Sequence, residues 1–166
     1  MQKKQPKKKS WVSKTTDMMY FAYGSNLSFV QMDSRCSKNI KLGIGILYGY
    51  RWIISSRGYA NVVKSDSDYV MGRIYKINKR DEDNLDEKEG YNSVPSCYDK
   101  EILPIIADGV SCNCFVYVDP VIQEGPPKNE YIDRINVGLV DSKFPDEYVE
   151  KYIRNKIPLI KKSREG

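Results

Sequence analysis

The chain has 166 residues, of which 40% are hydrophobic and 11% aromatic, a composition typical of one folded domain. No apolar run approaches the roughly 20 residues of a membrane-spanning helix, and the first residues lack a signal-peptide core, so we expect a cytoplasmic protein with no membrane partner. The formal net charge is +5, and Lys3, Lys4, Lys7, Lys8 and Lys9 account for all of it. The remainder is formally neutral, which argues against a folded body that binds nucleic acid.

The composition predicts one domain between two tails. Residues 1–16 are rich in Lys, Gln and Ser, which indicates a basic flexible tail. We expect a single domain over residues 17–158 and a second basic tail over residues 159–166. We interpret the Lys-rich N-terminal segment as a solvated tail. The alternative is an arm that binds nucleic acid or a membrane surface, and salt-dependent binding that vanished on deletion of residues 1–10 would support it.

The hydrophobic pattern predicts more strands than helices. Strands are expected at 18–21, 40–48, 51–55, within 57–63 after a turn, and at 69–77, 97–106 and 111–118. Turns are expected at 65–68 and 108–109. Helices are expected after Ser28 and at 78–90, 129–140 and 145–154. This order predicts an α+β domain built on a curled, largely antiparallel sheet or barrel, with helices at its edge or mouth.

The first predicted strand breaks at Gly24-Ser25-Asn26, and Ser28 can cap a following helix. A strand that turns into a helix in this way leaves backbone N–H groups pointing outward, which favours an anion-binding site. The same tripeptide also fits an ordinary strand–turn–helix corner, and these residues alone do not decide between the two.

The chain contains no histidine. This excludes Ser-His-Asp and Cys-His catalysis and histidine-based zinc hydrolysis. Acid–base chemistry near neutral pH must therefore use a carboxylate, Lys, Tyr or Cys with a shifted pKa. The four cysteines have no C-x-x-C spacing, so we expect reduced thiols and neither a metal nor a cofactor.

Glu89 is the candidate acid–base residue. It lies in the last turn of the helix expected over 78–90, just before Gly90. The carbonyls at a helix C-terminus disfavour another negative charge, and burial adds to this effect, so we expect a raised pKa for Glu89. The competing interpretation is that Glu89 is one of several exposed acids on an acidic surface helix.

Two stretches taken together resemble the gamma-glutamylcyclotransferase family. They are Tyr-Phe-Ala-Tyr-Gly-Ser-Asn-Leu at residues 20–27 and Leu-Asp-Glu-Lys-Glu-Gly at residues 85–90. The resemblance runs through most of residues 18–155 and also takes in Glu130-Tyr131 before a late helix. It implies a small mixed, mostly antiparallel β-barrel with flanking helices and an active site at its mouth.

The resemblance implies an enzyme that cyclises a γ-glutamyl group to 5-oxoproline and releases an amine or amino acid. Glu89 would be the catalytic acid–base residue. Tyr98 is the less secure match, because its spacing from Glu89 is about two residues longer than in the family. The implied substrate-binding residues are Tyr20, Phe21, Ala22, Tyr23, Gly24, Ser25, Asn26, Leu27, Tyr98 and Tyr131.

Three further questions stay open from the sequence. The alternative function is a non-catalytic member of the same fold that acts as a binding module for a small molecule or a protein. The expected partner is a small γ-glutamyl compound, and γ-glutamyl amino acids, glutathione and γ-glutamyl-lysine are not distinguished. A homodimer is the oligomeric state to be tested.

Overall fold

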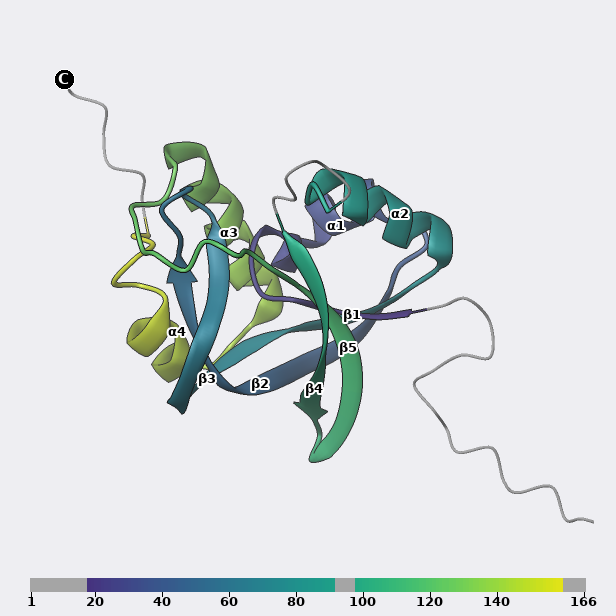
Figure 1. Cartoon of the computed structure of the whole chain (residues 1–166), viewed down its shortest axis with the longest axis horizontal. Coiled ribbons are helices and arrows are strands. Elements are labelled where there is room, and N and C mark those ends of the chain that lie inside the picture. Colours follow the sequence, from purple (N-terminus) through teal and green to yellow (C-terminus); the bar gives the residue numbers. More distant parts are fainter. Residues whose placement is uncertain (1–17, 92–97, 160–166) are drawn as a thin grey trace, which may run out of the picture.

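The computed structural model describes residues 18–91 and 98–159 (Figure 1). Five strands close into a barrel in the order β1-β3-β2-β4-β5. Neighbouring strands are antiparallel except β1 and β5, which run parallel where Tyr20 faces Phe115. The predicted mixed, mostly antiparallel barrel is therefore confirmed. The strands are β1 (Met18–Ala22), β2 (Ile40–Ile54), β3 (Ala60–Ile77), β4 (Asp99–Ala107) and β5 (Val110–Val118).

The helices lie close to their predicted positions. Ser28 caps α1 by accepting a hydrogen bond from the Gln31 backbone, and Asn78 caps α2 in the same way. Gly90 follows α2 with a φ of 68°, the left-handed conformation that glycine adopts easily. Within the described residues, no helix is long and apolar enough to cross a membrane. The helical segments are the 3-10 turn η1 (Ser25–Leu27), α1 (Phe29–Arg35), α2 (Lys79–Lys88), α3 (Asn129–Ser142) and α4 (Asp146–Tyr152).

The two strands predicted over 40–48 and 51–55 are wrong as separate elements, because β2 is continuous from Ile40 to Ile54. The register against β3 shifts at Lys41/Gly43 and at Tyr48/Tyr50. Gly43 and Gly49 have φ values of 133° and 82°. These glycines let the strand bulge and bend without ending, which is how a long strand curves around a barrel.

The turn predicted at 65–68 is wrong for a similar reason. Tyr48 pairs with Tyr69 and Tyr50 pairs with Lys64, so Ser65–Asp68 together lie opposite Gly49. The side-chain hydroxyl of Ser65 donates a hydrogen bond to the Asp68 carboxylate within this bulge. Turn-forming residues thus produce an irregularity inside one strand, β3, and not a hairpin between two.

Two hydrophobic clusters lie on opposite sides of β1, which is buried on both faces. Met19 and Phe21 belong to the cluster that includes residues of α3 and α4, whereas Tyr20 and Ala22 belong to the cluster that includes residues of α1 and α2. Figure 1 shows these two helix pairs on different sides of the barrel. Burial on both faces explains why β1 is a continuous run of bulky residues.

The tail predicted over 1–16 lies outside the described residues, as do residues 160–166 of the second tail and Cys97, the predicted start of a strand. Those predictions stand untested.

Candidate functional site

A cavity of about 770 Å³ opens where the barrel meets its helices. It is surrounded by the loop after β1, the C-terminal ends of α1 and α2, the turn before β3 and the first turns of α3, with single residues from β1, from β5 and from the segment before β4. The lining side chains and backbone are contributed by Tyr20, Tyr23–Asn26, Arg35, Arg57, Tyr59, Ala60, Glu87–Gly90, Tyr98, Tyr117, Lys128, Tyr131 and Arg134.

The loop after β1 is held by hydrogen bonds from two buried aromatic residues to its backbone carbonyls. The indole Nε1 of Trp52 donates to the carbonyl of Tyr23 at 2.9 Å, and the hydroxyl of Tyr75 donates to the carbonyl of Asn26 at 2.8 Å. Gly24 lies against Tyr131, where an added Cβ would be 2.7 Å from the tyrosine hydroxyl. The absence of a side chain at Gly24 therefore lets the loop and α3 approach closely.

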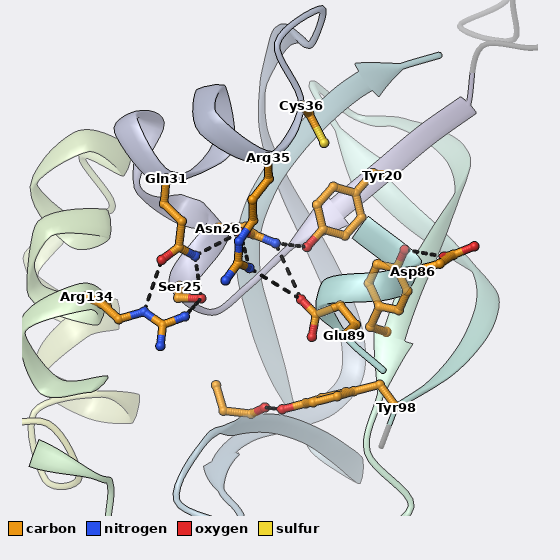
Figure 2. A network of polar contacts seen from close by, with 12 residues as sticks. Tyr20, Ser25, Asn26, Gln31, Arg35, Cys36, Asp86, Glu89, Tyr98 and Arg134 are labelled. Atoms are coloured by element: carbon orange, nitrogen blue, oxygen red, sulfur yellow. Dashed lines mark hydrogen bonds and ion pairs between the residues drawn. The ribbon is translucent and has the colours of Figure 1, made fainter. Parts of the chain in front are cut away.

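Asn26 is the centre of a polar network that joins the loop to α1 and α2 (Figure 2). Its Nδ2 donates to the hydroxyl of Tyr20 at 2.9 Å and lies 3.5 Å from Oε1 of Glu89. Its Oδ1 accepts hydrogen bonds from Gln31 at 2.9 Å and from Arg35 at 3.0 Å. With both ends of the amide bonded, the orientation of Asn26 is determined by its neighbours.

Glu89 ends α2 and points its carboxylate into the cavity beside Asn26 (Figure 2). Its side chain is only 18% exposed. Burial raises the pKa of Glu89 to about 6, while the positive charges of Arg35 and Arg134 act in the opposite direction. The predicted rise in pKa is confirmed, but removal of the carboxylate from water is its main cause, and not the helix terminus.

The tyrosines around Glu89 are protonated donors at neutral pH. Burial raises the pKa of Tyr131 to about 12 and raises that of Tyr98 further. The hydroxyl of Tyr98 donates to the carbonyl of Ala60 at 2.9 Å. Tyr131 packs edge-on against Tyr59, with ring centroids 5.1 Å apart. The cavity thus places the carboxylate of Glu89 among neutral hydroxyls.

The interpretation of α2 as a plain surface helix is wrong. Asp86, one turn before Glu89, is buried and accepts a hydrogen bond from the hydroxyl of Tyr117 at 2.6 Å. Nζ of Lys100, on β4, lies 2.8 Å from Asp86 and 2.7 Å from Glu82. A lysine contributed by a distant strand neutralises the buried acids and joins α2 to the barrel.

Eight of the predicted site residues line the cavity: Tyr20, Tyr23, Gly24, Ser25, Asn26, Glu89, Tyr98 and Tyr131. The other three, Phe21, Ala22 and Leu27, are buried in the hydrophobic clusters, with exposures of 0%, 1% and 2%. Their packing fixes β1 and the loop after it against the hydrophobic clusters, next to the cavity.

Sequence reasoning missed Arg35, Arg134 and Gln31. Arg35 lies 4.0 Å from Glu89, and Arg134 reaches the loop from α3. A signal for Arg134 did exist, because it stands three residues after Tyr131 and so shares its side of the helix. Gln31 lies in the turn that follows the Ser28 cap, where nothing in the sequence marks it as part of a site.

Residues 20–136 match the sequence profile described as gamma-glutamyl cyclotransferase, AIG2-like. The chain belongs to this family. A gamma-glutamylcyclotransferase from Mus musculus is 31% identical over 146 residues, which cover 80% of this chain and 76% of the mouse protein. The corresponding protein from Homo sapiens is 30% identical over 143 residues, with the same coverage of each chain.

Solved structures agree with this assignment. A structure of a gamma-glutamyl cyclotransferase superimposes with a TM-score of 0.77 at 25% identity and covers 90% of this chain and 92% of its own. A crystal structure of an uncharacterised human protein has a TM-score of 0.74 at 27% identity, with 82% and 86% coverage. The barrel with its flanking helices is therefore the fold of this family.

Proposed function

We propose that the protein cyclises the γ-glutamyl group of a small γ-glutamyl compound to 5-oxoproline and releases the attached amine or amino acid. The observation that carries the proposal is the buried carboxylate of Glu89, whose pKa is raised to about 6 and which lies beside Asn26 in a cavity large enough for a dipeptide. Its relatives bear the name of this activity.

The reaction needs one group that accepts a proton and returns it. Glu89 takes a proton from the α-ammonium of the substrate, and the freed amine attacks the γ-carbonyl carbon. A C–N bond closes the five-membered ring, Glu89 protonates the departing nitrogen, and the original amide C–N bond breaks. The ring nitrogen gives up its second proton to solvent, which leaves the neutral lactam. A carboxyl group whose pKa lies about one unit below neutral pH serves both steps, because it is mostly ionised yet returns a proton readily.

The remaining contribution is positioning. The γ-glutamyl chain must fold back so that its amine reaches its own carbonyl, and the substrate thus supplies its own nucleophile. In this proposal the loop Tyr23–Asn26 holds the γ-glutamyl group, chiefly through backbone N–H groups, while Tyr98 and Tyr131 contact it from the other walls. The hydrogen bonds from Trp52 and Tyr75 that hold the loop carbonyls support such a preorganised role.

The test is an assay of 5-oxoproline by mass spectrometry, with γ-glutamyl dipeptides, glutathione and γ-glutamyl-lysine as substrates. Wild type and the variant Glu89→Gln are compared with Glu150→Gln, which changes an exposed glutamate on α4. We expect release by wild type and by Glu150→Gln, with a loss of at least about 100-fold for Glu89→Gln.

Release by all three proteins would remove Glu89 from the mechanism while keeping the activity. If no substrate releases 5-oxoproline, the proposal fails, and binding of the same compounds by calorimetry would then favour the non-catalytic binding module.

A further inference from the structure

We propose that Arg134 binds the α-carboxylate of the γ-glutamyl group and that Gln31 is the residue that positions it. This inference rests on the proposed function and adds a specificity-determining residue to it. The α-carboxylate is common to every γ-glutamyl substrate, whatever amine is released.

Arg134 is held in place over the loop from two sides (Figure 2). Its Nε donates to Oε1 of Gln31 at 3.0 Å, and its Nη2 donates to the hydroxyl of Ser25 at 3.2 Å. The guanidinium also lies 5.2 Å from the centre of the Tyr131 ring. These contacts fix the planar group and leave N–H bonds of the guanidinium to face a ligand.

Gln31 connects this arginine to the substrate loop. Its Nε2 donates to Ser25 at 2.7 Å and to Asn26 at 2.9 Å, while its carbonyl oxygen accepts from Arg134. One neutral amide therefore sets the relative positions of the arginine, the loop and Asn26. Because the acceptors on Gln31 and Ser25 are neutral, the positive charge of Arg134 is not cancelled by them.

The two other arginines that line the cavity differ in this respect. Arg35 faces the carboxylate of Glu89 at 4.0 Å, and Arg57 lies 3.6 Å from the buried carboxylate of Asp119. The carboxylate neighbour of Arg134 is Glu130, which is 4.0 Å away and 64% exposed, so water screens the attraction strongly. Of the arginines that line the cavity, Arg134 is therefore the one best able to accept a new anion.

The chemistry of the substrate brings a carboxylate close to Glu89. The α-ammonium and the α-carboxylate are attached to the same carbon, so when the ammonium lies at Glu89 the carboxylate lies a short distance away, where a cation can bind it. Arg134 and Glu89 line the same cavity, and the positive charge of Arg134 lowers the pKa of Glu89. A carboxylate bound to Arg134 would direct the neighbouring amine toward Glu89.

The experiment compares kcat/KM for three substrates: γ-glutamyl-alanine, its analogue with an α-carboxamide on the glutamyl unit, and γ-glutamyl-alaninamide. The proteins are wild type, Arg134→Gln, Gln31→Glu and Arg80→Gln, the last removing an exposed arginine of α2. We expect wild type to prefer the α-carboxylate over the α-carboxamide by about 10- to 100-fold. Arg134→Gln should lose most of this preference, and Arg80→Gln should keep it.

Gln31→Glu tests the positioning role. A carboxylate at this position still accepts a hydrogen bond from Arg134 but cancels its charge, and it loses the hydrogen bonds that Nε2 donates to Ser25 and Asn26. The preference for the α-carboxylate should therefore fall relative to that of wild type. An equal loss of kcat/KM on all three substrates in Arg134→Gln would overturn the inference. The inference would also be overturned if Arg134→Gln lost activity on γ-glutamyl-alanine but not on γ-glutamyl-alaninamide, because Arg134 would then bind the carboxylate of the released alanine.

Binding measurements keep this test separate from the proposed function. Calorimetry with 5-oxoproline and with its neutral amide requires no turnover. Weaker binding of 5-oxoproline alone in Arg134→Gln would support the carboxylate site even in a protein that releases nothing. Equal affinities of wild type for 5-oxoproline and its amide would overturn it even in an active enzyme.

Discussion

The side-chain amide of Asn26 lies 3.5 Å from the carboxylate of Glu89, although 63 residues separate them in the chain. Asn26 comes from the turn after β1, and Glu89 ends α2. Their meeting brings the two conspicuous motifs of the sequence together in one cavity. Burial of Glu89 in this cavity raises its pKa to about 6 and so gives a chain without histidine a carboxyl group suited to proton transfer.

The first prediction concerns the pH dependence of activity. Because Glu89 acts as a base only when ionised, and its pKa is about 6, kcat/KM should rise with pH through an acidic limb centred near pH 6. Initial rates of 5-oxoproline release between pH 4.5 and 8 in buffers of constant ionic strength measure it. A limb centred near pH 4.5 would show that Glu89 is not desolvated in the active protein.

The second prediction concerns stability. The pKa of Glu89 is raised from 4.5 to about 6 on folding, so ionisation of its side chain destabilises the folded state by about 2 kcal/mol. The penalty is absent below pH 4.5, where the group is protonated in both states, and it develops as pH rises through 6. The free energy of unfolding of Glu89→Gln, relative to that of wild type, should therefore be about 2 kcal/mol more favourable to the folded state at pH 8 than at pH 4.

Urea unfolding at both pH values measures this gain. Glu150→Gln, an exposed site, should show no such change between the two pH values. A constant difference in free energy between wild type and Glu89→Gln would contradict the assignment of the shifted pKa.

The third prediction concerns the contact between Gly24 and Tyr131. Gly24→Ala would place a methyl group 2.7 Å from the tyrosine hydroxyl, so we expect a loss of about 1–3 kcal/mol of stability and lower activity. In the double variant with Tyr131→Phe the hydroxyl is gone, and most of the lost stability should return. Thermal unfolding of the four proteins in this cycle measures the coupling. Strictly additive losses would show that the methyl group does not meet Tyr131.

The fourth prediction concerns Lys100. Lys100→Met leaves the carboxylates of Asp86 and Glu82 buried without their cation, and side-chain exposures of 7% and 9% give water little access to them. We expect a loss of about 3–5 kcal/mol in the free energy of unfolding, measured by urea denaturation. Lys79→Met removes an exposed partner of Asp83 that also lies 3.7 Å from Glu82, and it should cost at most about 1 kcal/mol because water screens the Lys79 charge. Equal effects of both substitutions would contradict the buried ion pair.

Much of the local structure was predictable from the sequence. Ser28 and Asn78 mark helix starts, Gly90 marks a helix end, and Asp108-Gly109 marks the hairpin between β4 and β5. Each of these signals acts within about four residues along the chain, through a capping hydrogen bond or a φ value that glycine tolerates. The two motifs that predict the cavity, residues 20–27 and 85–90, are likewise each a short continuous stretch of the chain.

The length of β2 and β3 could not be predicted in this way. Gly49 and Ser65–Asp68 resemble chain reversals, and they become bulges because a neighbouring strand continues to pair on either side of them. Whether a bend ends a strand therefore depends on a partner that the sequence does not identify.

The electrostatic character of the site was likewise decided by the tertiary structure. The pKa of Glu89 rises mainly because neighbouring elements exclude water from it, and Arg134 reaches Gln31 across 103 positions of the chain. The sequence by itself determined which residues could begin a helix, turn the chain or exchange a proton. Folding decided which of them lose their water and which charges they face, because desolvation and Coulomb interactions depend on distance in space and not on position in the chain.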